Sequence, residues 1–176
     1  MPASSQPQDH TREDQLRALF GLEPGDGGRS GTDAKDDQGR TFELKSTTKD
    51  RVTTARDVST RHLERWRGRT WIIGRGEYSG TTFHFQSTWV LTPAQLEPWF
   101  LKIENRLVES RRLGERVLAA CGTNDFRDDE RQRIAAILKR GSTLNNPHIT
   151  LRFIETNGTR VTDHHAERLQ EIVAAR

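Results

Sequence analysis

Three charged residues have the types and the spacing that metal-dependent phosphate chemistry needs. Asp33 precedes Glu43 by ten residues, and Glu43 precedes Lys45 by two. Two carboxylates supply the hard oxygen ligands that Mg²⁺ prefers, and the backbone carbonyl of Leu44 can supply another. Mg²⁺ polarises a phosphate and lowers the pKa of a bound water, while a lysine stabilises charge on the phosphate or orients that water.

The residues around this trio predict a strand and a hairpin. Residues 40–45 alternate between polar and apolar side chains, so Glu43 and Lys45 point to the same face. The stretch Asp-Gln-Gly at 37–39 predicts a turn that brings Asp33 back beside them. The spacing alone is common in a charged chain, and by itself it favours a solvated hairpin with an ion pair over a metal site.

Composition bounds the classes of protein. The chain has 176 residues, predicting one domain, and a formal net charge of +3. This surplus favours a polyanionic partner, although a codon bias toward arginine explains it equally well. Cys121 is the single cysteine, which excludes an internal disulfide and a cysteine-based zinc site. The polar start and the lack of a long apolar run predict a cytoplasmic protein without a membrane segment.

The rest of the chain interleaves helical and strand patterns. Helices are expected at 11–22, 57–67 with Asp57 as the cap, 128–139 and 163–175. Thr92 to Gln95 has the pattern of a helix start with a capping box, followed by an apolar stripe of Leu96, Trp99, Phe100, Ile103 and Leu107. Strands are expected at 40–45, 71–74, 82–91 and 149–154, with a turn at 77–80. This order predicts an α/β (α+β) fold with a central mixed β-sheet flanked by helices.

Residues 28–46 go beyond a loose pattern. They read G-R-S-G-T-D-A-K-D-D-Q-G-R-T-F-E-L-K-S. This segment resembles, without a gap, the G-R-E-G-N-D-A-V-D-N-A-G-Q-E-Y-E-L-K-S of PvuII-like type II restriction endonucleases, in the PD-(D/E)XK nuclease superfamily. Similar matches follow in order at R-W-R (65–67), W-I-I (71–73), L-T-P-A-Q-L-E (91–97), N-N-P-H-I (145–149) and N-G-T-R-V (157–161).

The resemblance implies roles for individual residues. Asp33 and Glu43 would be Mg²⁺ ligands and Lys45 the catalytic lysine, within a PD-(D/E)XK restriction-endonuclease-like fold. Two positions depart from the family. Ser30 stands where the family has an acidic residue, and Trp66 stands where it has a tyrosine.

The resemblance also implies how the chain is divided into regions. Residues 1–10 are expected to be a disordered tail, and 11–27 an N-terminal helix and loop for dimerisation. Residues 28–161 would form the catalytic and DNA-recognition domain, with a helical insertion at about 113–142. Residues 162–176 would add a C-terminal helix.

Two alignments compete for the residues that read DNA, where the family has S-T-H-H-H. The preferred one places Thr54, Arg56 and Asp57 there, because it leaves the following helix without a gap. Arginine can pair with guanine, but a phosphate contact fits Arg56 equally well. A helix cap is favoured over a base contact for Asp57. The alternative register uses Ser59, Arg61 and His62.

Further candidates lie toward the C-terminus. The resemblance implies that Asn145 and Asn146 lie in or near the base-contacting surface, and a turn before Pro147 is a compatible explanation. His148 can contact phosphate. His164 and His165 are interpreted as a surface cap of the last helix in preference to a zinc site.

The resemblance implies a homodimeric type II restriction endonuclease that uses Mg²⁺ and cuts double-stranded DNA at a palindromic site. The products would carry 5′-phosphate and 3′-hydroxyl ends, and the genetic partner would be a cognate DNA methyltransferase. Two alternatives stay open: a DNA repair or junction-resolving nuclease of the same superfamily, and a non-catalytic DNA-binding module.

Overall fold

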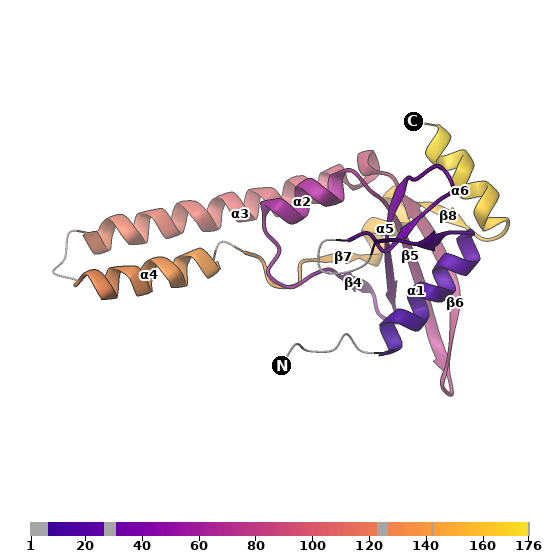
Figure 1. Ribbon diagram of the computed structural model, residues 1–176, viewed down its shortest axis with the longest axis horizontal. Coiled ribbons are helices and arrows are strands. Elements are labelled where there is room, and N and C mark those ends of the chain that lie inside the picture. The colour runs from indigo at the N-terminus through magenta and orange to yellow at the C-terminus, as the bar shows by residue number, and fades with distance from the viewer. Residues whose placement is uncertain (1–6, 27–30, 123–126, 142, 176) are drawn as a thin grey trace. The chain divides into compact units, whose positions relative to one another are not determined.

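The computed structural model describes residues 7–26, 31–122, 127–141 and 143–175, which form six helices and eight strands (Figure 1). The helices are α1 (Pro7–Phe20), α2 (Thr60–Arg67), α3 (Pro93–Gly122), α4 (Asp128–Gly141), α5 (Leu151–Asn157) and α6 (His165–Ala174). The strands are β1 (Glu23–Pro24), β2 (Ala34–Lys35), β3 (Thr41–Thr47), β4 (Arg51–Thr53), β5 (Thr70–Ser79), β6 (Thr82–Leu91), β7 (His148–Thr150) and β8 (Thr159–Val161).

Six of the strands form one mixed sheet in the order β1-β2-β3-β5-β6-β8. β3 and β5 pair in parallel, with Glu43 opposite Trp71, and the other neighbouring strands pair antiparallel. β4 and β7 form a separate two-stranded sheet. The mixed sheet with flanking helices confirms the predicted fold class.

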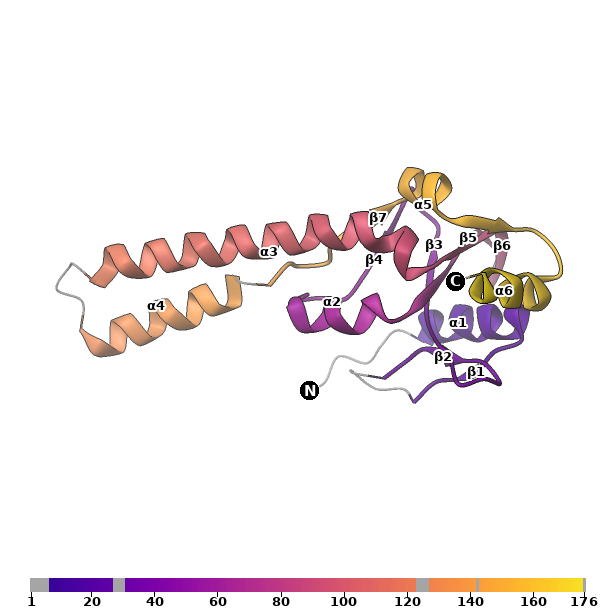
Figure 2. The same ribbon diagram turned by 90° about the horizontal axis from the view of Figure 1, so that it is seen from above.

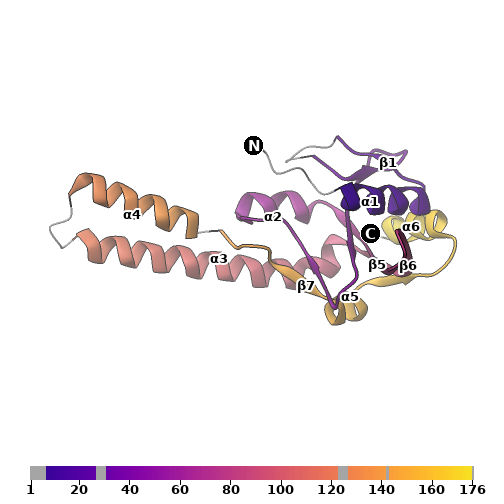
Figure 3. The ribbon, with the colours of Figure 1, turned by 90° about the horizontal axis from the view of Figure 1, so that it is seen from below.

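A core of apolar side chains fixes which way β3 faces. Phe42 and Leu44 are fully buried in it, together with Leu16 of α1 and Leu169 of α6. Figures 2 and 3 show α1 and α6 side by side against this sheet. Burying a leucine or phenylalanine is worth about 1.5–3 kcal/mol. Because successive strand residues alternate, this anchoring turns Glu43 and Lys45 to the other face of the sheet.

The chain divides into two compact units. The first comprises Met1–Val52, Gly68–Leu96 and Ile149–Arg176, and the second comprises Thr53–Arg67 and Glu97–His148. The expected insertion at about 113–142 belongs to the second unit, where α3 and α4 lie antiparallel and side by side (Figure 1). Within the described ranges, no helix combines the length and apolar character that crossing a membrane requires.

Two expected boundaries are placed differently. α1 begins at Pro7, so residues 7–10, which were expected in the tail, are helical, while 1–6 lie outside the described residues. β5 continues to Ser79 and replaces most of the turn expected at 77–80. The turn itself is short because Gly80 adopts a positive φ of 61°, which glycine tolerates without strain.

The start of α3 is confirmed in detail. The Thr92 amide donates to Gln95 Oε1 at 2.8 Å, and the Gln95 amide donates back to Thr92 Oγ1 at 3.4 Å. This reciprocal pair is the predicted capping box. The five residues of the predicted apolar stripe that follows are all buried: Leu96, Trp99, Phe100, Ile103 and Leu107.

The predicted cap of α2 is wrong. Asp57 has a left-handed backbone with φ 53°, and the helix begins three residues later at Thr60. The carbonyl of Ser59 accepts the first helical hydrogen bond, from the His62 amide at 3.0 Å. Ser59 therefore occupies the position that the sequence pattern assigned to Asp57.

The strand expected at 149–154 is also wrong. β7 ends at Thr150, and α5 begins at Leu151. The Thr150 hydroxyl accepts from the Phe153 amide at 3.3 Å, so it caps the helix. Alternation across this junction was produced by a three-residue strand followed by the buried face of a helix.

The two histidines at the start of α6 act differently from the predicted surface cap. His164 is the N-cap residue with a left-handed φ of 45°, but its side chain makes no capping hydrogen bond. His165 packs edge-on against Phe20 of α1, with ring centroids 5.0 Å apart. In the described part of the chain, no group of three or more His, Cys, Asp or Glu side chains is arranged to hold a metal ion.

Candidate active site

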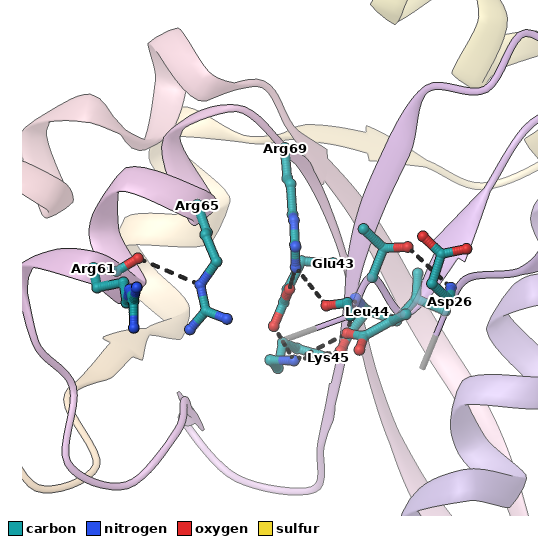
Figure 4. Close-up of polar contacts among 10 residues, drawn as sticks. Asp26, Glu43, Leu44, Lys45, Arg61, Arg65 and Arg69 are labelled. Atoms are coloured by element: carbon teal, nitrogen blue, oxygen red, sulfur yellow. Dashed lines mark hydrogen bonds and ion pairs between the residues drawn. The ribbon is translucent and has the colours of Figure 1, made fainter. Parts of the chain in front are cut away.

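The structure brings the three predicted residues together. The ammonium nitrogen of Lys45 lies 2.7 Å from Glu43 Oε1 and 3.2 Å from Asp33 Oδ2. It also donates to the Leu44 carbonyl oxygen at 2.9 Å. Figure 4 shows Lys45 directed at Glu43 beside the Leu44 backbone. One cation therefore contacts all three oxygens that were predicted to ligate a metal.

The β2–β3 hairpin positions Asp33 at this point. Ala34 pairs with Phe42, and the turn is held by Asp36, whose carboxylate accepts from the amides of Gln38 and Arg40 at 3.1 and 2.9 Å. Gly39 takes the positive φ of 74° that the predicted turn requires. The Leu44 amide then donates to Asp33 Oδ2 at 2.8 Å, which fixes the carboxylate against β3.

The trio is largely withdrawn from water. Exposed fractions of the side chains are 9% for Glu43, 19% for Lys45 and 25% for Asp33. Burial by itself lowers the pKa of Lys45, but the negative charges of Glu43 and Asp33 outweigh that effect and raise it above its ordinary value. The lysine is therefore held in its charged form in this arrangement.

A fourth residue, Arg69, belongs to the cluster and was missed by the sequence reasoning. Its Nη1 donates to Glu43 Oε2 at 2.9 Å and to the Gly31 carbonyl at 3.1 Å. Figure 4 shows Arg69 reaching Glu43 from the side opposite Lys45. The residue lies immediately before β5, two positions before Trp71, which pairs with Glu43. Only the register of β3 on β5, which the sequence does not reveal, brings it there.

The donor set fits a hard divalent cation. Two carboxylates and one backbone carbonyl offer oxygen, the ligand atom that Mg²⁺ prefers. These oxygens already converge on one positive charge, the ammonium of Lys45. Asp33, Glu43 and Leu44 are thus the residues that would hold a metal ion.

The predicted DNA-contacting residues gather in the second unit. Thr54 donates from its amide and its hydroxyl to the Pro147 carbonyl, at 3.2 and 2.6 Å. Val58 and Leu144 exchange two backbone hydrogen bonds of 2.9 Å each. The segments 54–58 and 144–147 therefore run antiparallel, which sets the Arg56 segment beside the asparagine pair.

The side chains of this paired segment are available to a ligand. Arg56, Asp57, Asn145, Asn146 and His148 are all exposed. Asp57 and Asn146 have positive φ values of 53° and 46°, which L-residues rarely adopt. Aspartate and asparagine tolerate this region better than other residues, and it is typical of turns. The turn predicted for Asn145 and Asn146 and a contact with DNA are therefore compatible.

The residues of the alternative register, Ser59, Arg61 and His62, lie at the start of α2 and make contacts within that helix. His62 Nδ1 accepts from the Ser59 amide at 3.2 Å and lies 3.1 Å from the Ser59 hydroxyl. This contact sits at the start of α2, where it satisfies a free backbone donor. Arg61 is exposed on α2, and its carbonyl accepts from the Arg65 guanidinium at 3.3 Å (Figure 4). The choice between the two registers therefore stays a prediction.

Of the two positions that depart from the family pattern, Ser30 and Trp66, the structure describes only Trp66. Ser30 lies outside the described residues. Trp66 is buried and packs against Trp99 with ring centroids 6.2 Å apart. The tryptophan therefore contributes to the apolar interior of the second unit.

Comparison with known proteins gives one family. A family model described as restriction endonuclease PvuII matches residues 9–115, more than half of the 176 residues. The match includes Asp33, Glu43, Lys45 and Arg69, and it ends before Asn145. No curated protein matches the sequence.

Proposed function

Because the chain belongs to the PvuII family of type II restriction endonucleases, which are site-specific deoxyribonucleases, we propose that Asp33, Glu43 and Lys45 form its Mg²⁺-dependent active site. The observation that carries this proposal is the convergence of two carboxylates and the Leu44 carbonyl on one cation. The reaction is hydrolysis of phosphodiester bonds in double-stranded DNA.

Each residue has a role that follows from its chemistry. When bound, Mg²⁺ supplies a Lewis acid for the scissile phosphate and lowers the pKa of a water. Asp33 and Glu43 supply its carboxylate ligands, and the hairpin contacts hold these two groups in place. Lys45 carries a positive charge at the same point, so it stabilises negative charge that develops on the phosphate. Hydrolysis would leave 5′-phosphate and 3′-hydroxyl ends.

Recognition is assigned to the paired segments of the second unit. Arg56 presents two donors suited to guanine, and Asn145 and Asn146 present amides suited to adenine. Thr54 holds the segments together, while Asp57 and His148 flank the exposed surface. A homodimer would read a palindromic site because two-fold symmetry repeats the same contacts on each half-site. A cognate DNA methyltransferase would protect the host sites.

Substitution of the trio tests the active-site assignment. We expect Lys45→Ala and Glu43→Gln to lower the rate of DNA cleavage by about a hundredfold or more, because each removes charge at the reacting phosphate or its metal. Matched controls are Lys102→Ala on α3 and Glu77→Gln on β5, whose side chains are exposed. The rate is measured on plasmid DNA with Mg²⁺, after circular dichroism has confirmed folding.

The same variants separate the alternatives. Lys45→Ala that still binds DNA but no longer cuts it excludes a non-catalytic DNA-binding module. Glu43→Gln that cuts at the wild-type rate contradicts the assigned site. Cutting that follows DNA structure instead of sequence supports a repair or junction-resolving nuclease.

A further inference from the structure

Arg69 joins two parts of the candidate site that are distant in sequence. A single guanidinium nitrogen contacts the Glu43 carboxylate on β3 and the Gly31 carbonyl, two residues before Asp33. The Arg69 side chain is 12% exposed and its carboxylate partner 9%. This ion pair is therefore well shielded from water. Hydrogen bonds between arginine and a carboxylate are stronger in such a shielded place than at an open surface.

The contact also divides the two oxygens of Glu43 between different partners. Arg69 takes Oε2, and Lys45 takes Oε1. With one oxygen held by a planar guanidinium, the other is turned toward the point that Asp33 and the Leu44 carbonyl also face. Arg69 holds the Gly31–Asp33 segment at Gly31. A second arginine holds it at the other end, since Arg17 donates to the Asp33 carbonyl at 3.1 Å.

We propose that Arg69 is a positioning residue, which holds Glu43 and the Gly31–Asp33 segment in the single arrangement that binds a divalent cation. This inference rests on the proposed function of the same site. Arg69 contacts a predicted metal ligand and not the reacting atoms, so its contribution is geometric. Groups that orient metal ligands in this way commonly contribute about ten- to a hundredfold to metal affinity.

If charge alone governed cation binding, removal of Arg69 would change the cation affinity in the opposite direction. The two carboxylates and the two cations of the cluster carry charges that sum to zero, so removing Arg69 leaves a net negative site. If charge alone mattered, a neutral residue at position 69 would strengthen cation binding. If orientation dominates, the same change weakens it. The direction of the effect therefore decides between the two accounts.

The experiment measures Mn²⁺ binding to the full chain without DNA, using electron paramagnetic resonance of the free ion. We expect Arg69→Met to raise the dissociation constant for Mn²⁺ about tenfold. Arg69→Lys keeps the charge but not the planar guanidinium, so its constant should lie between those of the wild type and Arg69→Met. The matched control is Arg67→Met, which removes an arginine that bridges Glu97 and Glu104 at 3.1 and 2.8 Å, neither of them a predicted ligand. It should leave Mn²⁺ binding unchanged.

Each outcome has a defined meaning. Arg69→Met that binds Mn²⁺ as tightly as the wild type, or more tightly, overturns the inference. If Arg69→Met does not fold, Arg69→Lys decides: weaker binding supports the inference and unchanged binding overturns it. Wild-type protein that binds no Mn²⁺ overturns both this inference and the proposed function. Wild-type protein that binds Mn²⁺ but cuts no DNA contradicts the proposed function alone.

Discussion

Four charged side chains of the site lie at low exposure: Asp33, Glu43, Lys45 and Arg69. This arrangement is not favoured by stability alone. Charged groups lose favourable hydration when they are withdrawn from water, whereas apolar residues in the same place would not. Removing one partner of such a pair typically costs about 3–5 kcal/mol, because the other charge is left uncompensated. We infer that the cluster is retained for chemistry.

The sequence identified three of these four residues. Asp33, Glu43 and Lys45 were predicted from a local hairpin together with the family resemblance of residues 28–46. Arg69 depends on the parallel pairing of β3 with β5, which joins segments more than twenty residues apart. No local pattern encodes that register, so the arginine was not recognised.

A prediction at this scale concerns Arg56. If it reads a base, Arg56→Gln should weaken binding to the cognate duplex by about 1–3 kcal/mol and leave non-specific binding nearly unchanged. Fluorescence anisotropy with cognate and scrambled duplexes, in buffer without divalent cations, measures both. The matched control is Arg61→Gln, at an exposed position of α2. Equal losses on both duplexes would identify a phosphate contact, and a cognate-specific loss in Arg61→Gln would favour the alternative register.

At the scale of elements, predictions succeeded where a single local interaction decides the structure. The capping box of α3 involves Thr92 and Gln95, and the β2–β3 turn involves Asp36 and Gly39. Predictions failed where two elements meet. The pattern at 149–154 crosses from β7 into α5, and the cap of α2 moved from Asp57 to Ser59 because residues 54–58 pair with 144–147. Long-range pairing overrode the local signal.

The packing of α6 on α1 gives a pH-dependent prediction. Burial lowers the pKa of His165 below its ordinary value of 6.5, with Asp163 opposing the shift. The unfolded chain therefore takes up a proton before the folded protein does. Stability should fall as the pH drops through 6.5 toward the folded pKa and then level off.

Urea unfolding at about pH 7.5 and about pH 5.5 measures this effect. His165→Gln should lose less free energy of unfolding between the two conditions than the wild type does. His84→Gln on β6, where the histidine is exposed, is the control and should behave as the wild type. Equal losses in His165→Gln and wild type would contradict the prediction.

At the scale of the whole molecule, the proposed function assigns one task to each unit. The first holds Asp33, Glu43, Lys45 and Arg69, and the second holds the segments with Arg56 and Asn145. Hydrolysis of a phosphodiester requires the same groups whatever the DNA sequence, whereas recognition depends on contacts to base edges. The family match covers the whole trio but ends at residue 115, so the proposed recognition surface includes segments outside it.

Digestion of a long DNA of mixed sequence by the purified protein with Mg²⁺ tests the central claim most directly. Wild-type protein should produce discrete fragments whose sequenced ends share one short palindrome and carry 5′-phosphates. Glu43→Gln, treated in parallel, should leave the DNA intact. A continuous smear, ends without a common sequence, or the same fragments from Glu43→Gln would contradict the claim.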